Sequence, residues 1–247
     1  MTRRARTFQA IGWLLTYPEA PLLAAAPEIL EVMEEERLLT AARLASLRRF
    51  VEDLRAEDLI EAQERYVAQF DRSRQISLHL FEHVHGESRD RGMAMVNLRE
   101  IYLAAGLAPD STELPDFLPM YLEYLSRLPQ SEARGGLGDV APILQVLHKR
   151  LAQRDSRYAD LVGALLDIAG VKPLELDKGS DVEPADDTPE AIDRAWEETA
   201  VAFGPENDPQ KGGDCGRASA MMERINQLDR GAGPGAGTRT EVGEARK

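Results

Sequence analysis

The chain has 247 residues, with 43 Asp and Glu against 30 Lys and Arg, so its formal net charge is −13 at pH 7. Such a surface repels nucleic-acid phosphate and anionic lipid, and it favours a basic partner. The single cysteine, Cys215, excludes an internal disulfide, and a reducing cytoplasm is the expected compartment. No apolar run approaches the roughly 20 residues that span a bilayer, so we expect no transmembrane helix.

Apolar residues recur at helical spacing along most of the chain, and no period-two strand rich in β-branched residues stands out. A first helix is expected over residues 3–17, with Phe8, Ile11 and Leu15 on its buried face. Arg3 and Arg4 at its start resemble a twin-arginine export signal, but the apolar stretch that follows is too short for one.

Further helices are predicted by the same spacing. One starts at Pro27, and others cover residues 44–54 and 59–70. Another ends at Gly106, and the next ones begin at Pro115 and at Asp139 with Pro142. The last covers residues 156–169 and ends at a C-capping glycine, Gly170. The pattern predicts an all-α fold, a single-domain helical bundle over residues 1–170.

The C-terminal third has a different composition. Residues 171–187 are rich in acids with little to bury, which is typical of a linker. Over residues 188–203 a helix is predicted, and its stripe of Ile192, Trp196 and Phe203 must pack on the core or on a partner. Residues 204–247 are predicted to form a disordered tail.

Three of the four histidines lie in the segment SLHLFEHVHGESRDRG, residues 77–92. His79, Glu82 and His83 spell HxxEH, the pattern of inverted zinc peptidases, in which the glutamate is the base. On a helix, positions i and i+4 share a face, so a zinc-dependent hydrolase is one interpretation. It needs a third ligand, and Glu100 and Glu113 are available.

Two other interpretations of this segment remain open. It could be an amphipathic helix with Leu78 and Phe81 inward and the HxxEH side chains at the surface. It could also be a recognition surface, because acidic and basic side chains alternate as in the polar rim of an interface. The charged residues are Glu82, Glu87, Asp90, Arg72, Arg74, Arg89 and Arg91.

The sequence in and around this segment resembles a known protein family. The stretch YVAQFDR at 66–72, the histidine segment, and ELPDFLP at 113–119 closely resemble the NarJ family, the delta-type assembly chaperones of respiratory nitrate reductase. The resemblance covers about residues 8–169 and is strongest over residues 66–125.

This resemblance implies an all-helical fold shared with TorD-like redox-enzyme maturation proteins. It implies a non-enzymatic role in the cytoplasm, in which the apo catalytic (alpha) subunit is bound until its molybdenum cofactor and an iron-sulfur cluster are inserted. No resident cofactor or metal is expected. Glu113, Pro115 and Asp116 match the E-x-P-D-H block of the wider group, but Phe117 replaces its histidine, so nucleotide binding is not carried over.

The resemblance and the charge together predict a client site. The client's N-terminal segment can fold as a basic amphipathic helix, which suits an apolar groove with acidic rims. Apolar anchors would be Tyr66, Phe70, Leu78 and Phe81, each of which could instead belong to the core. The other predicted client-binding residues are Asp71, His79, Glu82, His83, His85, Glu87, Arg89, Asp90, Glu113 and Asp116. Protonation of the three histidines would make client affinity depend on pH.

Overall fold

The computed structural model of the protein describes residues 5–72, 76–85, 90–108 and 113–175. Several predicted segments lie outside these residues: the first two residues of the 3–17 helix, most of the acidic linker, the 188–203 helix and the tail. Within the described residues the fold is all-α, as predicted, and the chain has no strand there apart from one isolated bridge between His79 and Phe117.

The helices of the described residues follow one another with short connections. They are α1 (Arg6–Leu14), α2 (Ala20–Glu36), α3 (Ala41–Ala56), α4 (Leu59–Phe70), α5 (Glu82–His85), α6 (Asp90–Ala104), α7 (Leu118–Arg127), α8 (Gln130–Gln153) and α9 (Tyr158–Ala169). None of them is long and apolar enough to cross a membrane, as far as the described residues extend.

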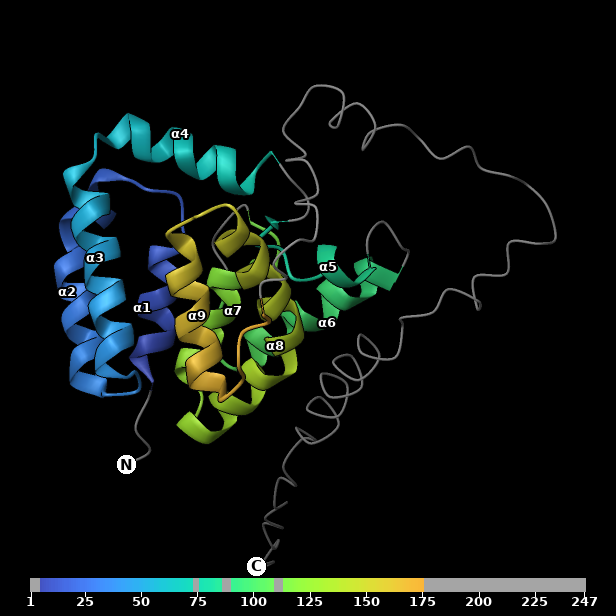
Figure 1. The fold of residues 1–247 in the computed structure, drawn as a ribbon. Coiled ribbons are helices and arrows are strands. Elements are labelled where there is room, and N and C mark those ends of the chain that lie inside the picture. Colours follow the sequence, from blue (N-terminus) through green and yellow to red (C-terminus); the bar gives the residue numbers. More distant parts are fainter. Residues whose placement is uncertain (1–4, 73–75, 86–89, 109–112, 176–247) are drawn as a thin grey trace, which may run out of the picture.

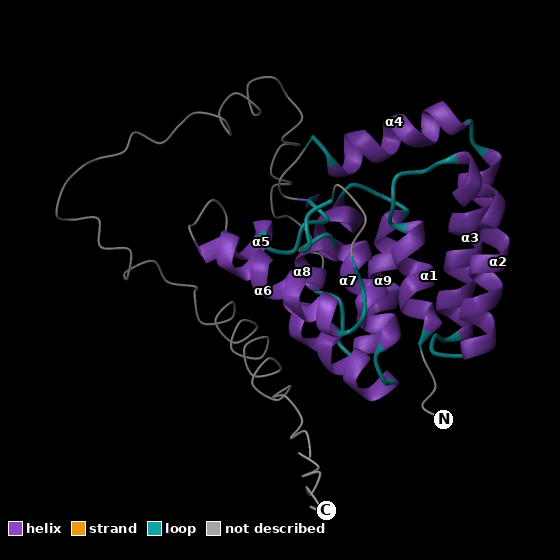
Figure 2. Cartoon of the chain, turned by 180° about the vertical axis from the view of Figure 1, so that it is seen from behind, coloured by secondary structure: helices purple, strands orange, loops and turns teal. Residues whose placement is uncertain are grey.

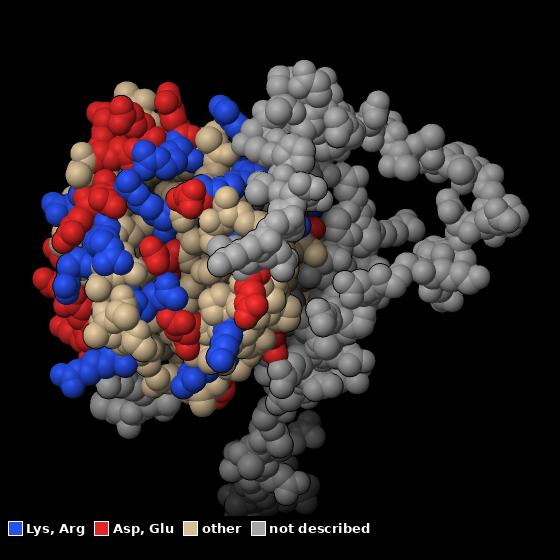
Figure 3. Space-filling view, in the orientation of Figure 1, with Lys and Arg blue, Asp and Glu red and all other residues tan. Residues whose placement is uncertain are grey.

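Helix α1 lies at the centre of the bundle, where it packs on α2, α7 and α9. Helices α2 and α3 form one edge of the molecule, and α5 and α6 lie at the opposite edge (Figures 1 and 2). Helix α4 crosses the top of the bundle instead of running along it. On the face in Figure 3, acidic side chains gather at the α2 edge and over α4, with basic ones interspersed.

The close approach of α1 and α7 depends on a glycine. A Cβ at Gly12 would lie 3.2 Å from the carbonyl oxygen of Pro119, which is backbone and cannot swing aside. Beside it, the predicted face of α1 is fully buried, with Phe8, Ile11 and Leu15 all at 0% exposure. The amphipathic spacing therefore identified the central helix of the core correctly.

An aromatic cluster attaches α4 to the bundle. The ring of Tyr66 lies 4.9 Å from that of Phe70 and 5.6 Å from that of Tyr17, between centroids, and Phe70 packs on Tyr158 of α9. The Tyr66 hydroxyl donates a 3.0 Å hydrogen bond to the carbonyl oxygen of Leu15, just after α1. Because each ring buries a large apolar area, this cluster holds α4 across the bundle.

Three predicted helix starts are wrong, and each involves a proline. Helix α2 begins at Ala20 and contains Pro27, and α8 runs unbroken through Pro142. A proline in a helix interior costs roughly 3 kcal/mol, but both halves of α8 bury apolar side chains against neighbouring helices, which offsets it. Helix α7 begins at Leu118 instead of Pro115. The predicted helix ends at Gly106 and Gly170 are confirmed: α6 ends at Ala104 and α9 at Ala169, and the two glycines have φ angles of 74° and 73°.

Candidate functional site

The first half of the histidine segment is extended, not helical. The Leu80 amide donates to the Asp116 carbonyl at 3.0 Å, and the Leu118 amide donates to the Leu78 carbonyl at 2.8 Å, which makes a two-residue bridge. Helix α5 begins only at Glu82. His79 and His83 therefore do not share a helix face, and the prediction that the HxxEH pattern lies on one helix is wrong.

The histidine side chains have separate partners. His79 Nδ1 lies 3.2 Å from the Asp116 carboxylate, whereas His83 Nε2 lies 2.8 Å from the carbonyl oxygen of Ser77. The hydrogen bond to Asp116 raises the pKa of His79, and burial lowers the pKa of His83. Among the described residues, no group of three or more His, Cys, Asp or Glu side chains is placed to hold a metal ion.

Asp116 is a buried connection point and does not lie on a rim. Its side chain has 0% exposure, and while one carboxylate oxygen faces His79, the other accepts a 3.0 Å hydrogen bond from the Phe81 amide. A buried carboxylate is stable only when it is hydrogen-bonded or paired. Arg91, which lies 3.3 Å from Glu82, also approaches Asp116 to 3.9 Å. The interpretation of Asp116 as a rim carboxylate is therefore corrected.

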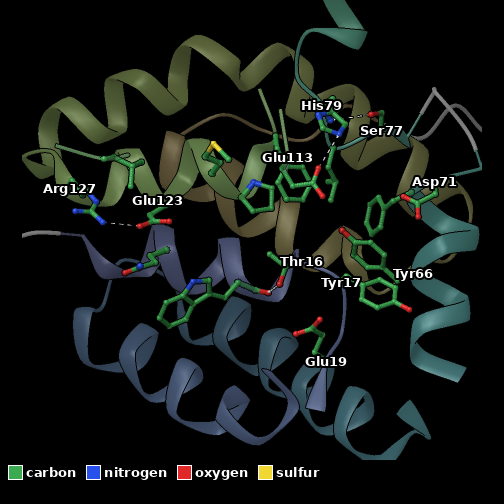
Figure 4. A pocket seen from close by; sticks show the side chains of 18 of the residues that line it. Thr16, Tyr17, Glu19, Tyr66, Asp71, Ser77, His79, Glu113, Glu123 and Arg127 are labelled. Atoms are coloured by element: carbon green, nitrogen blue, oxygen red, sulfur yellow. Dashed lines mark hydrogen bonds and ion pairs between the residues drawn. The ribbon is translucent and has the colours of Figure 1, made fainter. Parts of the chain in front are cut away.

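A large cleft opens next to this connection point. Its volume is about 920 Å³, and α1, the α1–α2 connection, the end of α4, the extended segment at 77–79 and α7 line it (Figure 4). A cleft of this size fits several side chains of a polypeptide segment. We call it the α1–α7 cleft.

Aromatic side chains make up much of its apolar lining. Trp13 and Tyr17 are 48% and 42% exposed, although most rings of this size are largely buried in a folded protein. Tyr66 and Phe70 are only 5% and 6% exposed and contribute to the floor. The remaining apolar lining comes from Leu78, Leu107, Ala108, Phe117, Pro119 and Met120.

The charged lining is acidic. Four carboxylates and one cation line it, Glu19, Asp71, Glu113 and Glu123 with Arg127, which leaves the cleft at −3 when His79 is neutral. Arg127 binds Glu123 at 2.9 Å. Among the described residues, Glu19 and Asp71 have no ion pair, and Glu113 has only His79 at 3.9 Å. Burial raises the pKa of Asp71, as expected for a carboxyl group without a cationic partner close by.

The cleft brings together part of the predicted client-binding set. Those that line it are Tyr66, Phe70, Asp71, Leu78, His79 and Glu113. Phe81 is core at 1% exposure, and Glu82, His83 and Asp116 lie outside the lining. Glu87 and Arg89 lie outside the described residues, as do the side chains of His85 and Asp90.

Several lining residues were not predicted, above all Trp13, Tyr17 and Met120. A signal existed for Trp13, because it follows Ile11 by two positions and so falls off the buried stripe of α1. Because tryptophan is enriched at interfaces, a tryptophan on the polar side of an amphipathic helix is a candidate contact residue. No comparable signal marks Glu19, Glu123 or Arg127, since charged residues are common along this chain.

The fold and the cleft define a class of protein: an all-α bundle with an acidic, aromatic-lined cleft suited to a polypeptide. Sequence comparison agrees, because residues 35–162 match the family model described as nitrate reductase delta subunit. The chain belongs to this family, as the resemblance indicated. The family consists of assembly chaperones and not of catalysts, so it supports a non-enzymatic protein.

The relatives cover most of the chain. It is 49% identical over 196 residues to the nitrate reductase molybdenum cofactor assembly chaperone NarJ of Escherichia coli (strain K12), which is 78% of this chain and 83% of that one. It is 44% identical to the probable chaperone of the same description, NarW, from that organism, over 81% of this chain and 84% of NarW. The probable NarJ of Bacillus subtilis (strain 168) is 30% identical to this chain, over 67% of this chain and 89% of that relative.

Proposed function

We propose that the protein is a cytoplasmic chaperone that binds the apo catalytic (alpha) subunit of a respiratory nitrate reductase, including its N-terminal segment. It holds this client competent for insertion of the molybdenum cofactor and an iron-sulfur cluster, before membrane attachment. The names of its relatives support the chaperone role. The observation that carries the finer proposal is the α1–α7 cleft, with exposed aromatic rings and a net charge of −3.

The cleft has the two properties that a basic amphipathic helix requires. The helix can bury its apolar side against Trp13, Tyr17 and Met120, which removes apolar surface from water. Its cationic side can face Asp71 and Glu113. Within the described residues, Asp71 has no ion pair and Glu113 has only His79 at 3.9 Å, so both charges are available to a client. Apolar contact then supplies most of the affinity, while the carboxylates speed up the encounter and select against acidic segments.

Such a chaperone needs no chemistry of its own. If it binds the open, cofactor-free client more tightly than the closed one, it raises the open population by its differential affinity alone. Cofactor insertion closes the client and removes that preference, so release follows. No nucleotide or metal takes part in this cycle.

Binding of a synthetic client N-terminal peptide to the full chain tests the proposal. Trp13→Ala removes a partly exposed ring from the cleft without emptying the core, so we expect a loss of about 2 kcal/mol, roughly a 30-fold rise in Kd, by calorimetry. The matched control is Ile60→Ala on α4, which is 64% exposed and outside the cleft, and should leave Kd unchanged.

A second pair of variants, one in the cleft and one control, tests the role of the acidic lining. Glu113→Lys should slow association severalfold, whereas Glu61→Lys, on an exposed position of α4 away from the cleft, should not. Equal affinity of the Trp13→Ala variant and the parent would contradict the cleft as the client site. If reversal of Glu87 and Asp90 abolished binding instead, the client would bind the histidine segment.

A further inference from the structure

Helix α6 is apolar on two opposite faces. Ala94, Leu98 and Tyr102 follow one another at helical spacing and are at most 1% exposed, so they form its inner face. Met93, Val96 and Leu103 are 63%, 50% and 45% exposed. Their spacing of three and seven places them on one face, opposite the buried one. We call this set the outer face of α6.

This outer face is electrically balanced. Among the side chains of α6 that the structure describes, the exposed charged ones are Arg99 and Glu100, one of each sign, while Arg91 at the start of the helix pairs with Glu82. None of the residues of the outer face lines the α1–α7 cleft, so client binding there does not account for its exposure. Exposed apolar side chains in line on one helix face indicate a contact surface.

We propose that the outer face of α6 is the docking surface for residues 188–203 of the same chain. In that segment Ile192, Trp196 and Phe203 recur at helical spacing, so they form an apolar stripe on a predicted helix. A stripe of this kind requires an apolar partner surface. The outer face of α6 supplies one of matching kind: three apolar side chains in line over three turns.

The connection is long compared with α6. Residue 172 is held beside α8, because the Gln145 side chain donates to the Lys172 carbonyl at 2.6 Å. Helices α6 and α8 lie toward the same end of the molecule (Figures 1 and 2). The residues from 175 to 188 can span about 40 Å when extended, whereas the 15 residues of α6 are only about 22 Å long.

The charge of the segment favours the outer face of α6 over the α1–α7 cleft as its docking surface. Residues 188–203 carry Glu190, Asp193, Glu197, Glu198 and Arg194, which is four negative charges and one positive charge, or −3. The α1–α7 cleft is also at −3 and repels such a segment, whereas the outer face of α6 is neutral. The cleft therefore stays open to a basic client while the acidic segment binds elsewhere. This inference does not depend on the proposed function.

Tryptophan fluorescence of the full chain tests the contact. The chain has two tryptophans, so Trp13→Phe leaves Trp196 as the sole reporter. We expect a blue-shifted emission that is shielded from acrylamide. Val96→Glu combined with Leu103→Glu should shift it to the red and raise quenching severalfold, whereas Ile60→Glu on α4 should leave it unchanged. Circular dichroism checks that the variants fold.

Single charge changes at exposed positions give the expected sign without a risk to the core. Arg99→Glu should increase acrylamide quenching of Trp196, and Glu100→Lys should decrease it, because the docked segment is acidic. The inference is overturned if neither set of changes alters the quenching, or if only Glu113→Lys in the cleft does. Shielding that depends on protein concentration would also overturn it, since the contact would then lie between two copies.

Discussion

His79 and His83 are the two histidines of the HxxEH pattern, but they have opposite surroundings in the fold. His79 lies between carboxylates: Asp116 at 3.2 Å and Glu113 at 3.9 Å. His83 is largely buried, and its Nε2 faces the Ser77 carbonyl oxygen. Because a carbonyl oxygen only accepts, Nε2 must carry the hydrogen of this bond. Sequence spacing predicted neither environment, because both depend on the pairing of residues 78–80 with residues 116–118.

The two histidines should titrate on opposite sides of the ordinary value of about 6.5. The hydrogen bond to Asp116 raises the pKa of His79, so its ring signals should titrate above that value by NMR. Burial lowers the pKa of His83, so its signals should titrate below it. Asp116→Asn should lower the midpoint of His79 and leave that of His83 nearly unchanged; the reverse order of the two midpoints would refute this account.

These shifts have opposite consequences for stability. The contribution of His79 is complete below pH 6.5 and is lost as the pH rises through its higher folded pKa. For His83 the unfolded state binds the proton more readily, so stability falls as the pH drops below 6.5. Of these two histidines, only His79 lines the cleft, so the predicted pH dependence of client affinity centres on His79 with Asp116, Glu113, Glu82 and Asp71 around it.

The first turn of α1 is capped from another element. Its N-cap residue, Ala5, has no side chain that could accept a hydrogen bond. Glu36, at the end of α2, accepts bonds from the amides of Arg6 and Thr7 at 2.8 Å each, and from the Thr7 hydroxyl at 2.7 Å. A carboxylate at this end of a helix also interacts favourably with the helix dipole.

Glu36→Gln should lower the free energy of unfolding by about 2 kcal/mol, because the amide nitrogen of glutamine would face donors and leave one of them unsatisfied. Urea denaturation measures this. The matched control is the neighbouring Glu35→Gln, whose exposed pair with Arg6 should be worth less than about 1 kcal/mol. Equal losses from the two changes would show that Glu36 acts only as a surface charge.

Helix boundaries show where local rules were insufficient. Amphipathic spacing located the buried face of α1, with Phe8, Ile11 and Leu15, because burial follows the 3.6-residue period. Proline positions misled the prediction, since Pro27 and Pro142 lie inside helices. Packing on both sides of each proline outweighs its local preference.

At the scale of the whole molecule, the net charge of −13 should govern how a basic client approaches. We expect the association rate of the client peptide to fall by about tenfold or more between low and high salt, since charges beyond the screening length no longer attract it. The dissociation rate should change little, because apolar contacts hold the complex. Stopped-flow measurements with Trp13 as reporter in a Trp196→Phe chain separate the two rates, and a salt effect confined to dissociation would contradict this expectation.

The sequence by itself determined the all-α class, the buried face of α1, the acidic character and the family, because these depend on composition, on local periodicity and on strings such as ELPDFLP. Only the tertiary structure decided the candidate site. Residues far apart in the chain, such as Trp13, Asp71 and Glu113, meet in one cleft. The bridge between residues 78–80 and 116–118 separates the two histidines of the HxxEH pattern, because backbone pairing and burial of Asp116 override the local helical pattern.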